Sequence, residues 1–539
     1  MSMTPEEAIT QTVGIARPGT WADPVTFAEV WDRTVERDPG ALFLRYAAPD
    51  GTVGEWSYGA FDRRVDAVAA RLHVAGVRRG RAVHMALANG PAFVAVWLAS
   101  VRLGAVMVPS DPFGKAPELA GHISRTKPAM GFCAADRAGE YRKAVTEAKE
   151  LAPDLDMAVV AVDEQAPHLD GVIGGGGVSA PAPARPEIGV RDTAAVMFTS
   201  GTTGRPKGVE ITQANYAFCG KIMAERAGFD PDARLLVVLP LFHGNAQYYS
   251  FAAAIWSGAA IVLQPAFSAS HFCAQAAAGA ATAASLFAAP LRMILARGAS
   301  GPRLTLDHCW YAQNVNDDQY AQLSELFGCL PRQLWGMTET LPAALTNPRT
   351  DPVPSSMGQQ TPGCLVDVQD ADGGPVPDGE VGELVVGGER GITLFSGYLD
   401  DPETTEASFR DGWLLTGDRT RRDAAGHYYF DGRHSEVLKV SGENVSVVAV
   451  EAVLAAHPGV LEAAVVGRAD PIRDEVPVGF VVARDPARPP SSAELLAWCG
   501  ERLGKAAMPR DLTLLDELPR TSVGKIRKFL LAGRAAVGA

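Results

Sequence analysis

Apolar positions along the chain alternate between the period of a helix and that of a strand. Apolar side chains recur every three or four residues from Phe61 to Leu72, which predicts a helix over 57–76 with Ser57 as its cap. A helix near 91–103 is predicted in the same way. Short apolar runs predict strands at 82–87, 105–109, 194–198, 235–239 and 260–263. This alternation is typical of an α/β fold with largely parallel sheets.

The pattern changes after about residue 430. Strands predicted at 459–467 and 476–484 precede a helix whose start at Ser491 fits a capping box, and a last strand follows at 511–515. We therefore expect a large, multi-lobed α/β N-terminal domain over 1–431 and a small α+β C-terminal domain over 436–539. The segment 432–435 is expected to join them. A glycine- and proline-rich connector at 171–187 is expected to cross the surface.

Charge narrows the classes of partner. The 539 residues include 49 Lys and Arg against 62 Asp and Glu, a formal net charge of −13. An acidic balance argues against a general nucleic-acid binder, which needs a basic face to neutralise phosphate. Hydrophobic residues make up 47% and charged residues 21%, as in a globular protein rather than a disordered, collagen-like or coiled-coil chain. A local basic pocket for a small anion stays compatible with this composition.

The cysteine spacing and the apolar runs indicate the cellular compartment of the protein. Seven cysteines, an odd number with no pair at CxxC spacing, predict buried thiols rather than a disulfide framework or a zinc site. The first residues show no basic region followed by an apolar run, and the longest apolar stretch, 251–263, is too short to span a bilayer. These patterns predict a cytoplasmic protein without a membrane span.

A glycine- and hydroxyl-rich segment follows the strand predicted at 194–198. It comprises Thr199, Ser200, Gly201, Thr202, Thr203, Gly204, Arg205, Pro206 and Lys207. Glycines let a backbone approach an anion closely, hydroxyls donate hydrogen bonds, and Lys207 supplies positive charge, so the segment suits the phosphates of a nucleotide. It is not a Walker A loop, because no Gly-Lys-Ser/Thr closes it at that spacing. From these residues alone, a polar turn is the other interpretation.

Further motifs follow in a fixed order along the chain. They are Trp335-Gly336-Met337-Thr338-Glu339-Thr340, Thr416-Gly417-Asp418, Gly432-Arg433, Lys439-Val440-Ser441-Gly442-Glu443-Asn444 and Pro519-Arg520-Thr521-Ser522-Val523-Gly524-Lys525. With the loop at 199–208, these motifs resemble those of the ANL superfamily, which comprises acyl-CoA synthetases, peptide-synthetase adenylation domains and luciferases. The resemblance covers nearly the whole chain, and five ordered motifs are far more specific than any one of them.

The resemblance implies an ATP-dependent reaction in two steps. A carboxylate attacks the α-phosphate of ATP, pyrophosphate leaves, and the acyl group passes from the adenylate to a second nucleophile. Catalysis of this kind rests on positioning and charge stabilisation. By the same resemblance Glu339 is a Mg²⁺ ligand and Thr338 bonds a phosphate, whereas Glu339 alone would be interpreted as a solvated carboxylate. The implied catalytic residues are Lys525, Thr338, Glu339 and Lys207.

The resemblance also implies a nucleotide site. Asp418 matches the residue that accepts hydrogen bonds from both ribose hydroxyls, and Arg433 matches a nucleotide-contacting arginine. Trp335 stands where relatives more often have Tyr; it is a candidate for stacking on adenine, and a core tryptophan is the alternative. The implied nucleotide-binding residues are Thr199, Ser200, Gly201, Thr202, Thr203, Gly204, Gln313, Asn314, Trp335, Gly336, Asp418 and Arg433.

The C-terminal domain is implied to be a mobile lid. Lys525 matches the lysine that neutralises charge between the substrate carboxylate and the α-phosphate. Without the resemblance, Lys525 would be interpreted as a surface lysine in a basic tail. Lys439 and Gly442 match the segment that approaches the acceptor after the lid rotates. The hinge position falls on Ser435, where most relatives have Asp or Lys, which leaves the balance of the two states open.

The acyl pocket departs from the common pattern. The segment 239–245 resembles the one whose His or aromatic residue gates that pocket, so His243 is a candidate and a capping histidine is the alternative. Amides at Gln313 and Asn314 stand where most relatives have glycines, and Gln247 and Gln264 add further polar groups or face solvent. Buried unpaired amides disfavour a long fatty chain, so we expect a small or polar acid. The implied pocket residues are His243, Asn245, Ala312 and Met337.

Three functions are compatible with these residues. The first is an acid:CoA ligase similar to the carnitine/crotonobetaine or short and aromatic acid branch, with ATP, Mg²⁺ and CoA and no nucleic-acid partner. The second is an adenylate-forming enzyme with another acceptor or oxyanion, such as a separate carrier protein, an amine, or nitrite for nitrogen–nitrogen bond or diazo formation. A non-catalytic nucleotide-binding regulator is the third and the most remote.

Overall fold

A computed structural model describes residues 19–166, 169, 183–199, 206–297, 302–433, 437–440, 443–470, 473–520 and 526–537. The chain divides into two compact units, each discontinuous in sequence. The larger unit comprises Met3–Val366 with Val386–Leu414, and the smaller one Asp367–Val385 with Leu415–Ala539. The division falls within strands β16 (Leu365–Gln369), β17 (Val381–Gly387) and β20 (Trp413–Arg422).

The first sheet of the larger unit has the order β15-β14-β13-β12-β11-β9-β10-β1-β2. From β1 to β13 its neighbours are parallel, and the outer pairs are antiparallel. Its strands are β1 (Leu42–Ala47), β2 (Val53–Ser57), β9 (Arg234–Val237), β10 (Ala260–Leu263), β11 (Ala283–Phe287), β12 (His308–Ala312), β13 (Arg332–Trp335), β14 (Leu345–Thr346) and β15 (Gln359–Gln360).

The second sheet of the larger unit has the order β18-β8-β7-β4-β3-β5-β6. Its pairs from β7 to β6 are parallel, whereas β8 is antiparallel to both β7 and β18. Its strands are β3 (Ala82–Ala86), β4 (Val106–Pro109), β5 (Met130–Ala134), β6 (Ala158–Val162), β7 (Thr193–Thr199), β8 (Lys207–Thr212) and β18 (Gly397–Tyr398). The two sheets confirm the predicted α/β fold with largely parallel strands.

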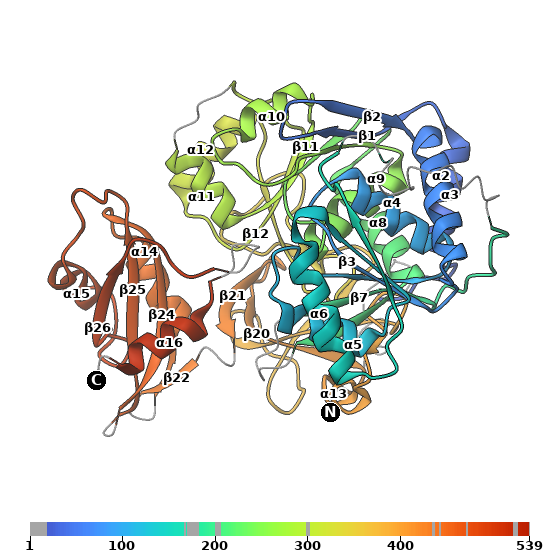
Figure 1. The fold of residues 1–539 in the computed structure, drawn as a ribbon. Helices are drawn as coiled ribbons and strands as arrows, with labels where there is room; N and C mark the ends of the chain where they lie inside the picture. Colours follow the sequence, from blue (N-terminus) through green and yellow to red (C-terminus); the bar gives the residue numbers. More distant parts are fainter. Residues whose placement is uncertain are drawn as a thin grey trace. The chain divides into compact units, whose positions relative to one another are not determined.

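Helices connect and cover these strands (Figure 1). Those of the larger unit are α2 (Phe27–Arg37), α3 (Tyr58–Val74), α4 (Pro91–Arg102), α5 (Ala116–Thr126), η1 (Ala135–Arg137), α6 (Ala138–Leu151), α8 (Gln213–Ala227), η2 (Asn245–Ala252), α9 (Ala253–Ser257), α10 (Phe272–Ala278), α11 (Ala288–Ala296), α12 (Asp317–Phe327) and α13 (Pro402–Ala407). Helix α3 confirms the prediction over 57–76, and the Ser57 side chain accepts a hydrogen bond from Ala60 N. Helix α4 is buried along its whole length, as expected of a helix enclosed by other layers.

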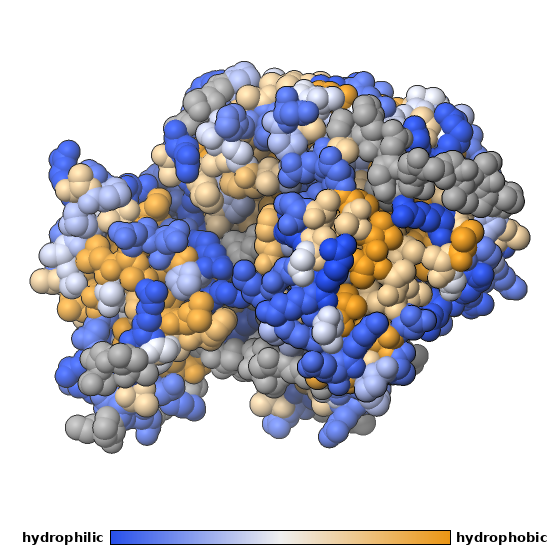
Figure 2. Space-filling model, in the orientation of Figure 1, coloured by the Kyte–Doolittle hydropathy of each residue, from blue (hydrophilic) through white to orange (hydrophobic). Residues whose placement is uncertain are grey.

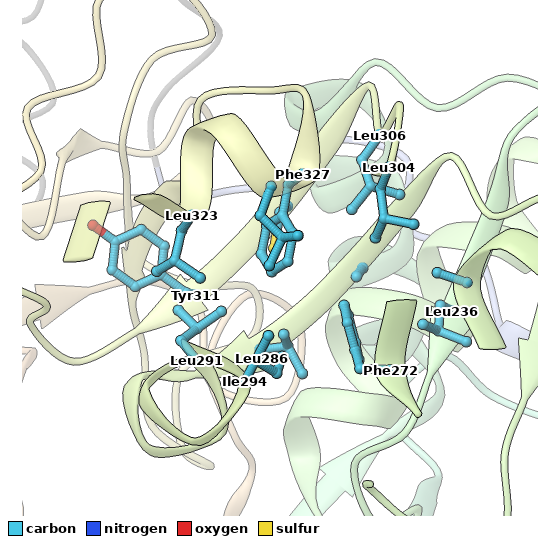
Figure 3. Close-up of a cluster of buried hydrophobic side chains, with 14 of the residues drawn as sticks. Leu236, Phe272, Leu286, Leu291, Ile294, Leu304, Leu306, Tyr311, Leu323 and Phe327 are labelled. Carbon is cyan, nitrogen blue, oxygen red and sulfur yellow. The ribbon is translucent and has the colours of Figure 1, made fainter. Parts of the chain in front are cut away.

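A hydrophobic cluster supports the ends of β11 and β12. Figure 3 shows side chains of α10, α11 and α12 converging on these strands, among them Phe272, Leu291 and Phe327. Tyr311 of β12 belongs to the cluster and donates from Oη to Pro354 O at 3.1 Å. Close packing of this kind transmits small displacements, so it fixes the residues that follow β12.

The smaller unit is built around antiparallel strands. One sheet has the order β23-β22-β25-β24, with β26 parallel to β25. Its elements are β22 (Val437–Val440), β23 (Glu443–Ser446), α14 (Val447–Ala455), β24 (Val460–Asp470), β25 (Asp474–Ala483), α15 (Ser492–Gly500), β26 (Asp511–Leu515) and α16 (Lys528–Val537). The strands predicted at 459–467, 476–484 and 511–515 are confirmed, and Ser491 caps α15 by accepting from Glu494 N at 3.2 Å.

A further sheet has the order β16-β17-β20-β19, with β21 (Tyr428–Arg433) beside β20 and β19 formed by Phe409–Arg410. Apolar side chains gather on the smaller unit in the face shown in Figure 2. Helix α16 exposes two large apolar side chains, Phe529 and Leu530.

The cysteines agree with the sequence prediction. All seven lie within the described residues as free thiols, six of them buried and Cys329 half-buried. Among the helices that the structure describes, none is both long enough and apolar enough to cross a membrane.

Candidate functional site

Two predicted site residues of the larger unit, Lys207 and Glu339, contact the same side chain, that of Tyr398. Lys207, the first residue of β8, places Nζ 4.6 Å from the centroid of the Tyr398 ring. The hydroxyl of Tyr398 donates to Oε1 of Glu339 at 2.9 Å, and Glu339 is 6% exposed. Burial and the neighbouring Glu339 carboxylate raise the pKa of Tyr398, so its hydroxyl stays protonated as a donor. We call Lys207, Tyr398 and Glu339 the phosphate-side cluster.

The cluster adjoins the glycine-rich segment at one end. Thr199, the last residue of β7, pairs with Lys207 across the antiparallel β7–β8 ladder. Main-chain contacts also tie Glu339 to the segment that carries Tyr398, because Phe395 N donates to Glu339 O at 3.0 Å. The structure therefore brings Glu339 close to Lys207 through Tyr398, although the two are far apart in the sequence, and Thr199 lies beside Lys207 in the ladder.

The segment Gly336–Thr340 forms a tight turn after β13. Met337 N donates to Oγ1 of Thr340 at 2.9 Å, and Thr340 N donates to Met337 O at 3.1 Å. Thr338 and Met337 are half-buried at the top of this turn. A Cβ on Gly336 would lie 2.6 Å from Oη of Tyr249, so any larger residue would require Tyr249 of η2 to shift.

Two neighbouring strands end beside this turn. Strands β12 and β13 are parallel, with Ala312 opposite Leu334, so Ala312 and Trp335 lie at the same edge of the sheet. Trp335 is buried at 9% exposure. Gln313 adopts a left-handed φ of 71°, and both Gln313 and Asn314 are exposed. The Gln333 side-chain amide lies 2.8 Å from Oδ1 of Asn314, which ties this edge to β13.

His243 and Asn245 lie where β9 leads into helix η2. This element has the i→i+5 pattern of a π-helix, which is rare and frequent at functional sites. Both amide atoms of Asn245 are buried without a hydrogen-bond partner in the described structure, and so is Nε2 of His243. Burial lowers the pKa of His243 to about 4, which keeps the ring neutral near pH 7.

A second amide of η2 behaves differently. Gln247 is fully buried, its Oε1 accepts from the hydroxyl of Tyr216, and its Nε2 donates to Leu241 O at 2.5 Å. Gln264 is also buried, at 4% exposure. Both side chains are therefore interior rather than solvent-facing, the alternative that the sequence left open.

The smaller unit carries Asp418, the predicted ribose-binding residue, and Arg433, a further predicted nucleotide contact. Asp418 on β20 is 3% exposed and faces Arg433 across the β20–β21 ladder, with Nε of Arg433 2.8 Å from Oδ1 of Asp418. Gly417 lies within β20 directly before Asp418; its N donates to Oε1 of Glu383 at 3.0 Å, and its φ is 72°. Asp418 and Arg433, each predicted separately as a nucleotide contact, form an ion pair with each other.

The remaining predicted residues divide into two groups. Lys439 has an exposed side chain on β22, and its main-chain N donates to Oε2 of Glu475 at 2.9 Å. The others lie outside the described residues: Ser200, Gly201, Thr202, Thr203, Gly204, Ser435, Gly442 and Lys525.

Tyr398 is the functional candidate that sequence reasoning missed. In the sequence Ser396-Gly397-Tyr398, an aromatic residue follows a glycine, which is common and indicates no function. Strand β18 is only two residues long. Tyr398 is distant in sequence from both Lys207 and Glu339, so its role depends on the antiparallel pairing of β18 with β8. No local sequence signal identifies it.

Comparisons with known proteins bear on this arrangement. Residues 31–399 match the family model described as AMP-binding enzyme, and residues 449–525 match that of the AMP-binding enzyme C-terminal domain. A crotonobetaine/carnitine–CoA ligase from Escherichia coli is 30% identical over 506 residues, covering 92% of this chain and 97% of that protein.

Solved structures agree with this match. ATP-bound MatB from Rhodopseudomonas palustris is similar with a TM-score of 0.82 at 26% identity, covering 95% of this chain and 99% of that one. The anthranilate CoA ligase AuaEII in complex with anthranoyl-AMP has a TM-score of 0.86 at 23% identity, covering 96% and 98%. That likeness supports the fold alone. By its family match, the chain belongs to the AMP-binding enzyme family of the ANL superfamily and is an ATP-dependent, AMP-forming ligase.

Proposed function

We propose that this ligase activates a small or polar carboxylic acid as an acyl-adenylate, releases pyrophosphate, and passes the acyl group to CoA. The observation that carries the proposal is the phosphate-side cluster, in which one tyrosine contacts a lysine through its ring and a buried carboxylate through its hydroxyl. This arrangement holds a cation and an anion beside the glycine-rich segment. Both charges are needed where a nucleotide polyphosphate and its metal bind.

The donor set fits Mg²⁺. The ion prefers one or two carboxylates together with substrate phosphates and water, rather than a dedicated cage of protein ligands. Glu339 supplies one buried carboxylate, and the described residues contain no group of three or more metal-ligating side chains. Glu339 would therefore hold the ion. Bound there, it would supply charge stabilisation for the departing pyrophosphate.

We assign nucleotide contacts to both units. In the larger unit these are Thr199 with the segment from Ser200 to Gly204, Thr338 at the phosphates, and Gln313, Asn314, Trp335 and Gly336 beside adenine. In the smaller unit, the buried carboxylate of Asp418 would accept hydrogen bonds from the ribose hydroxyls, with Arg433 beside it. Lys525 would neutralise charge between the attacking carboxylate and the α-phosphate.

Two states of the C-terminal domain would serve the two steps. We propose a body over 1–431, a hinge at 432–435 that turns at Ser435, and a lid over 436–539. Lys439 and Gly442 would face the acceptor in the second state. The exposed side chain of Lys439 supports this, because it is available to a partner that arrives later.

The acid would occupy a pocket formed with His243, Asn245, Ala312 and Met337. Buried amide atoms without partners cost about 1–3 kcal/mol per group, a cost that a polar substrate would offset and a fatty chain would not. Carnitine and crotonobetaine, after which the relative from Escherichia coli is named, are small acids that carry polar groups. The seven free thiols support a reducing, cytoplasmic compartment.

The acceptor is assigned by relationship, because the 30% identical relative from Escherichia coli is a CoA ligase. The unpartnered amide of Asn245 also suits a small polar oxyanion, so a second candidate keeps adenylation and uses a carrier protein, an amine or nitrite chemistry instead. Purified enzyme with ATP, Mg²⁺ and the activated acid should consume CoA in preference to an amine or nitrite with an arylamine. Consumption of either alternative without CoA turnover would favour the second candidate.

The adenylation step is tested by acid-dependent exchange of labelled pyrophosphate into ATP. A panel of short, aromatic and zwitterionic acids should contain at least one that supports exchange. Lys525→Ala should lower that exchange by about 10²–10³-fold, because a positioned charge is lost at the reacting phosphate. Lys505→Ala, an exposed lysine of the same unit, is the matched control. Equal exchange in the two variants would contradict the assignment of Lys525.

A further inference from the structure

Arg125 lies in the last turn of α5, outside every motif that the sequence singled out. We propose that Arg125 is a positioning residue that fixes Lys207 and Tyr398 of the phosphate-side cluster relative to each other; the inference rests on the proposed function for its kinetic consequences. Its evidence is a set of contacts that one guanidinium makes to three segments of the larger unit.

The guanidinium joins two main-chain carbonyls that flank the cluster. Nη1 donates to Pro206 O at 2.7 Å, and Nη2 donates to Leu399 O at 3.1 Å. Pro206 immediately precedes Lys207, and Leu399 immediately follows Tyr398. The same two strands are joined directly, because Leu399 N donates to Gly208 O at 2.8 Å. Arg125 therefore braces the pairing of β8 with β18, and this pairing places Lys207 beside the ring of Tyr398.

A third contact reaches the other end of the glycine-rich segment. The Arg125 guanidinium carbon lies 5.1 Å from the ring centroid of Phe198, the residue before Thr199. His122, one turn earlier on α5, stacks on the same ring at 4.0 Å with an interplanar angle of 5°. One helix face thus holds residues on both sides of 200–205: Phe198 before it and Pro206 after it.

The histidine in this arrangement is neutral. Burial, with a further contribution from the Arg125 charge, lowers the pKa of His122 to about 4. Its Nδ1 lies 2.8 Å from Oγ of Ser110, whose hydroxyl is 2.9 Å from Nε2 of the buried His84. A neutral ring can stack beside a guanidinium without repulsion, so the support of Phe198 persists across the neutral pH range.

Packing around Gly208 makes the arrangement sensitive to small displacements. A Cβ on Gly208 would lie 3.0 Å from Cγ1 of Val196, 3.1 Å from Cβ of Leu399 and 3.2 Å from Cε1 of Phe198. The segments that Arg125 joins are therefore already in close contact. Loss of the guanidinium is expected to shift β8 and β18 against each other, and misplacement by about 1 Å can cost about 10²-fold in rate.

Arginine is suited to this position by its shape. A planar guanidinium donates in two fixed directions and stacks on an aromatic face, whereas a lysine ammonium is a point charge on a flexible stem. Arg125→Lys keeps the charge and at most one of the two carbonyl contacts. It is expected to retain more activity than Arg125→Ala but less than the wild type.

The kinetic test compares these variants with Arg484→Ala. Arg484 of the smaller unit also joins two carbonyls, donating to Pro458 O at 3.0 Å and to Val460 O at 3.1 Å, so its loss removes a similar structural contact elsewhere. Arg125→Ala is expected to raise the KM for ATP and lower kcat, with a combined loss of about 10–100-fold in kcat/KM for ATP. The KM for the acid should change much less. Equal changes in both KM values, or a loss no greater than in Arg484→Ala, would overturn the positioning role.

A second measurement needs no ligand and no activity. Hydrogen exchange of the full chain should speed up in peptides containing Gly208 and Leu399 in Arg125→Ala, and not in Arg484→Ala. Unchanged exchange there would overturn the inference even if activity fell. If the wild type supports no acid-dependent pyrophosphate exchange, the proposed function fails, while the hydrogen-exchange result still decides whether Arg125 fixes these strands.

Discussion

The two polar regions of the larger unit are completed in opposite ways. In the phosphate-side cluster the protein supplies the partners: the Tyr398 hydroxyl donates to Glu339, and Lys207 lies over the Tyr398 ring. At His243 and Asn245 the buried Nε2 and both amide atoms have no partner in the described structure. The difference teaches that the protein itself satisfies the polar groups of one region, whereas the other region keeps buried polar atoms that the proposed acid would satisfy.

The comparison sharpens within a single helix. Asn245 and Gln247 are both buried amides of η2, yet the Gln247 side chain bonds Tyr216 and Leu241, whereas the Asn245 side-chain amide has no hydrogen-bond partner in the described structure. A buried unpaired amide is costly, so the unpaired amide of Asn245 needs an explanation that the paired amide of Gln247 does not. We interpret Gln247 as structural and Asn245 as a substrate contact.

Replacing the carboxylate of the phosphate-side cluster is expected to have the largest effect. Glu339→Gln keeps the shape and removes the charge that would hold Mg²⁺, so acid-dependent pyrophosphate exchange should fall by about 10²–10³-fold. Tyr398→Phe keeps the ring beneath Lys207 and removes only the donor to Glu339, so its loss should be smaller. Exchange rates at saturating ATP measure both. A larger loss in Tyr398→Phe than in Glu339→Gln would contradict the role of Glu339 as the metal-holding group.

The region of His243 and Asn245 is expected to respond in substrate preference. Asn245→Leu removes the unpaired amide at similar volume, so the kcat/KM ratio of a polar acid to an apolar acid of equal size should fall by about 10–100-fold, the equivalent of one lost buried hydrogen bond. The ratio is measured by pyrophosphate release with matched acids. An unchanged ratio would show that Asn245 does not contact the acid.

Much of the fold was predictable because it follows from local patterning. The helix from Ser57 and the strands at β3, β4, β7 and β10 appear where the apolar period placed them. Ordered motifs with fixed spacing also identified the family and most candidate residues. These features depend on few long-range contacts, so a single sequence carries them.

The rest depends on pairing between distant segments. Tyr398 and Arg125 belong to no local motif, and their positions follow from strand pairing and from two main-chain carbonyls. The difference between Asn245 and Gln247 is equally invisible in sequence, because it depends on whether Tyr216 lies within reach of each amide. Side-chain partners across more than a few residues are set by packing, which periodicity does not encode.

The stability of Gln247→Leu tests whether Gln247 and Asn245 differ in function. The substitution leaves the Tyr216 hydroxyl and Leu241 O without their buried partner, which should destabilise the larger unit by about 1–3 kcal/mol. Asn245→Leu leaves no protein group newly unpaired and should be neutral or stabilising without substrate. Thermal unfolding midpoints of the two ligand-free variants provide the comparison. Equal destabilisation would remove the distinction between a structural amide and a ligand-facing one.

The smallest expected effect is a pH dependence at His243. Burial lowers its pKa to about 4 from an ordinary value near 6.5, and the opposing influence comes from Asp111. Between pH 6.5 and pH 4 the unfolded chain therefore binds a proton at His243 more readily than the folded chain does. His243 thus lowers the free energy of unfolding as the pH falls through this range, and it contributes no pH dependence above it. The thermal unfolding midpoint should fall between pH 7.5 and pH 5, and this fall should be smaller in His243→Gln than in the wild type. Because His243 stays neutral from pH 6 to 8, its replacement should leave the shape of the pH–activity profile unchanged over that range. If the wild type shows an inflection near neutrality that is lost in His243→Gln, the ring titrates there and this expectation is wrong.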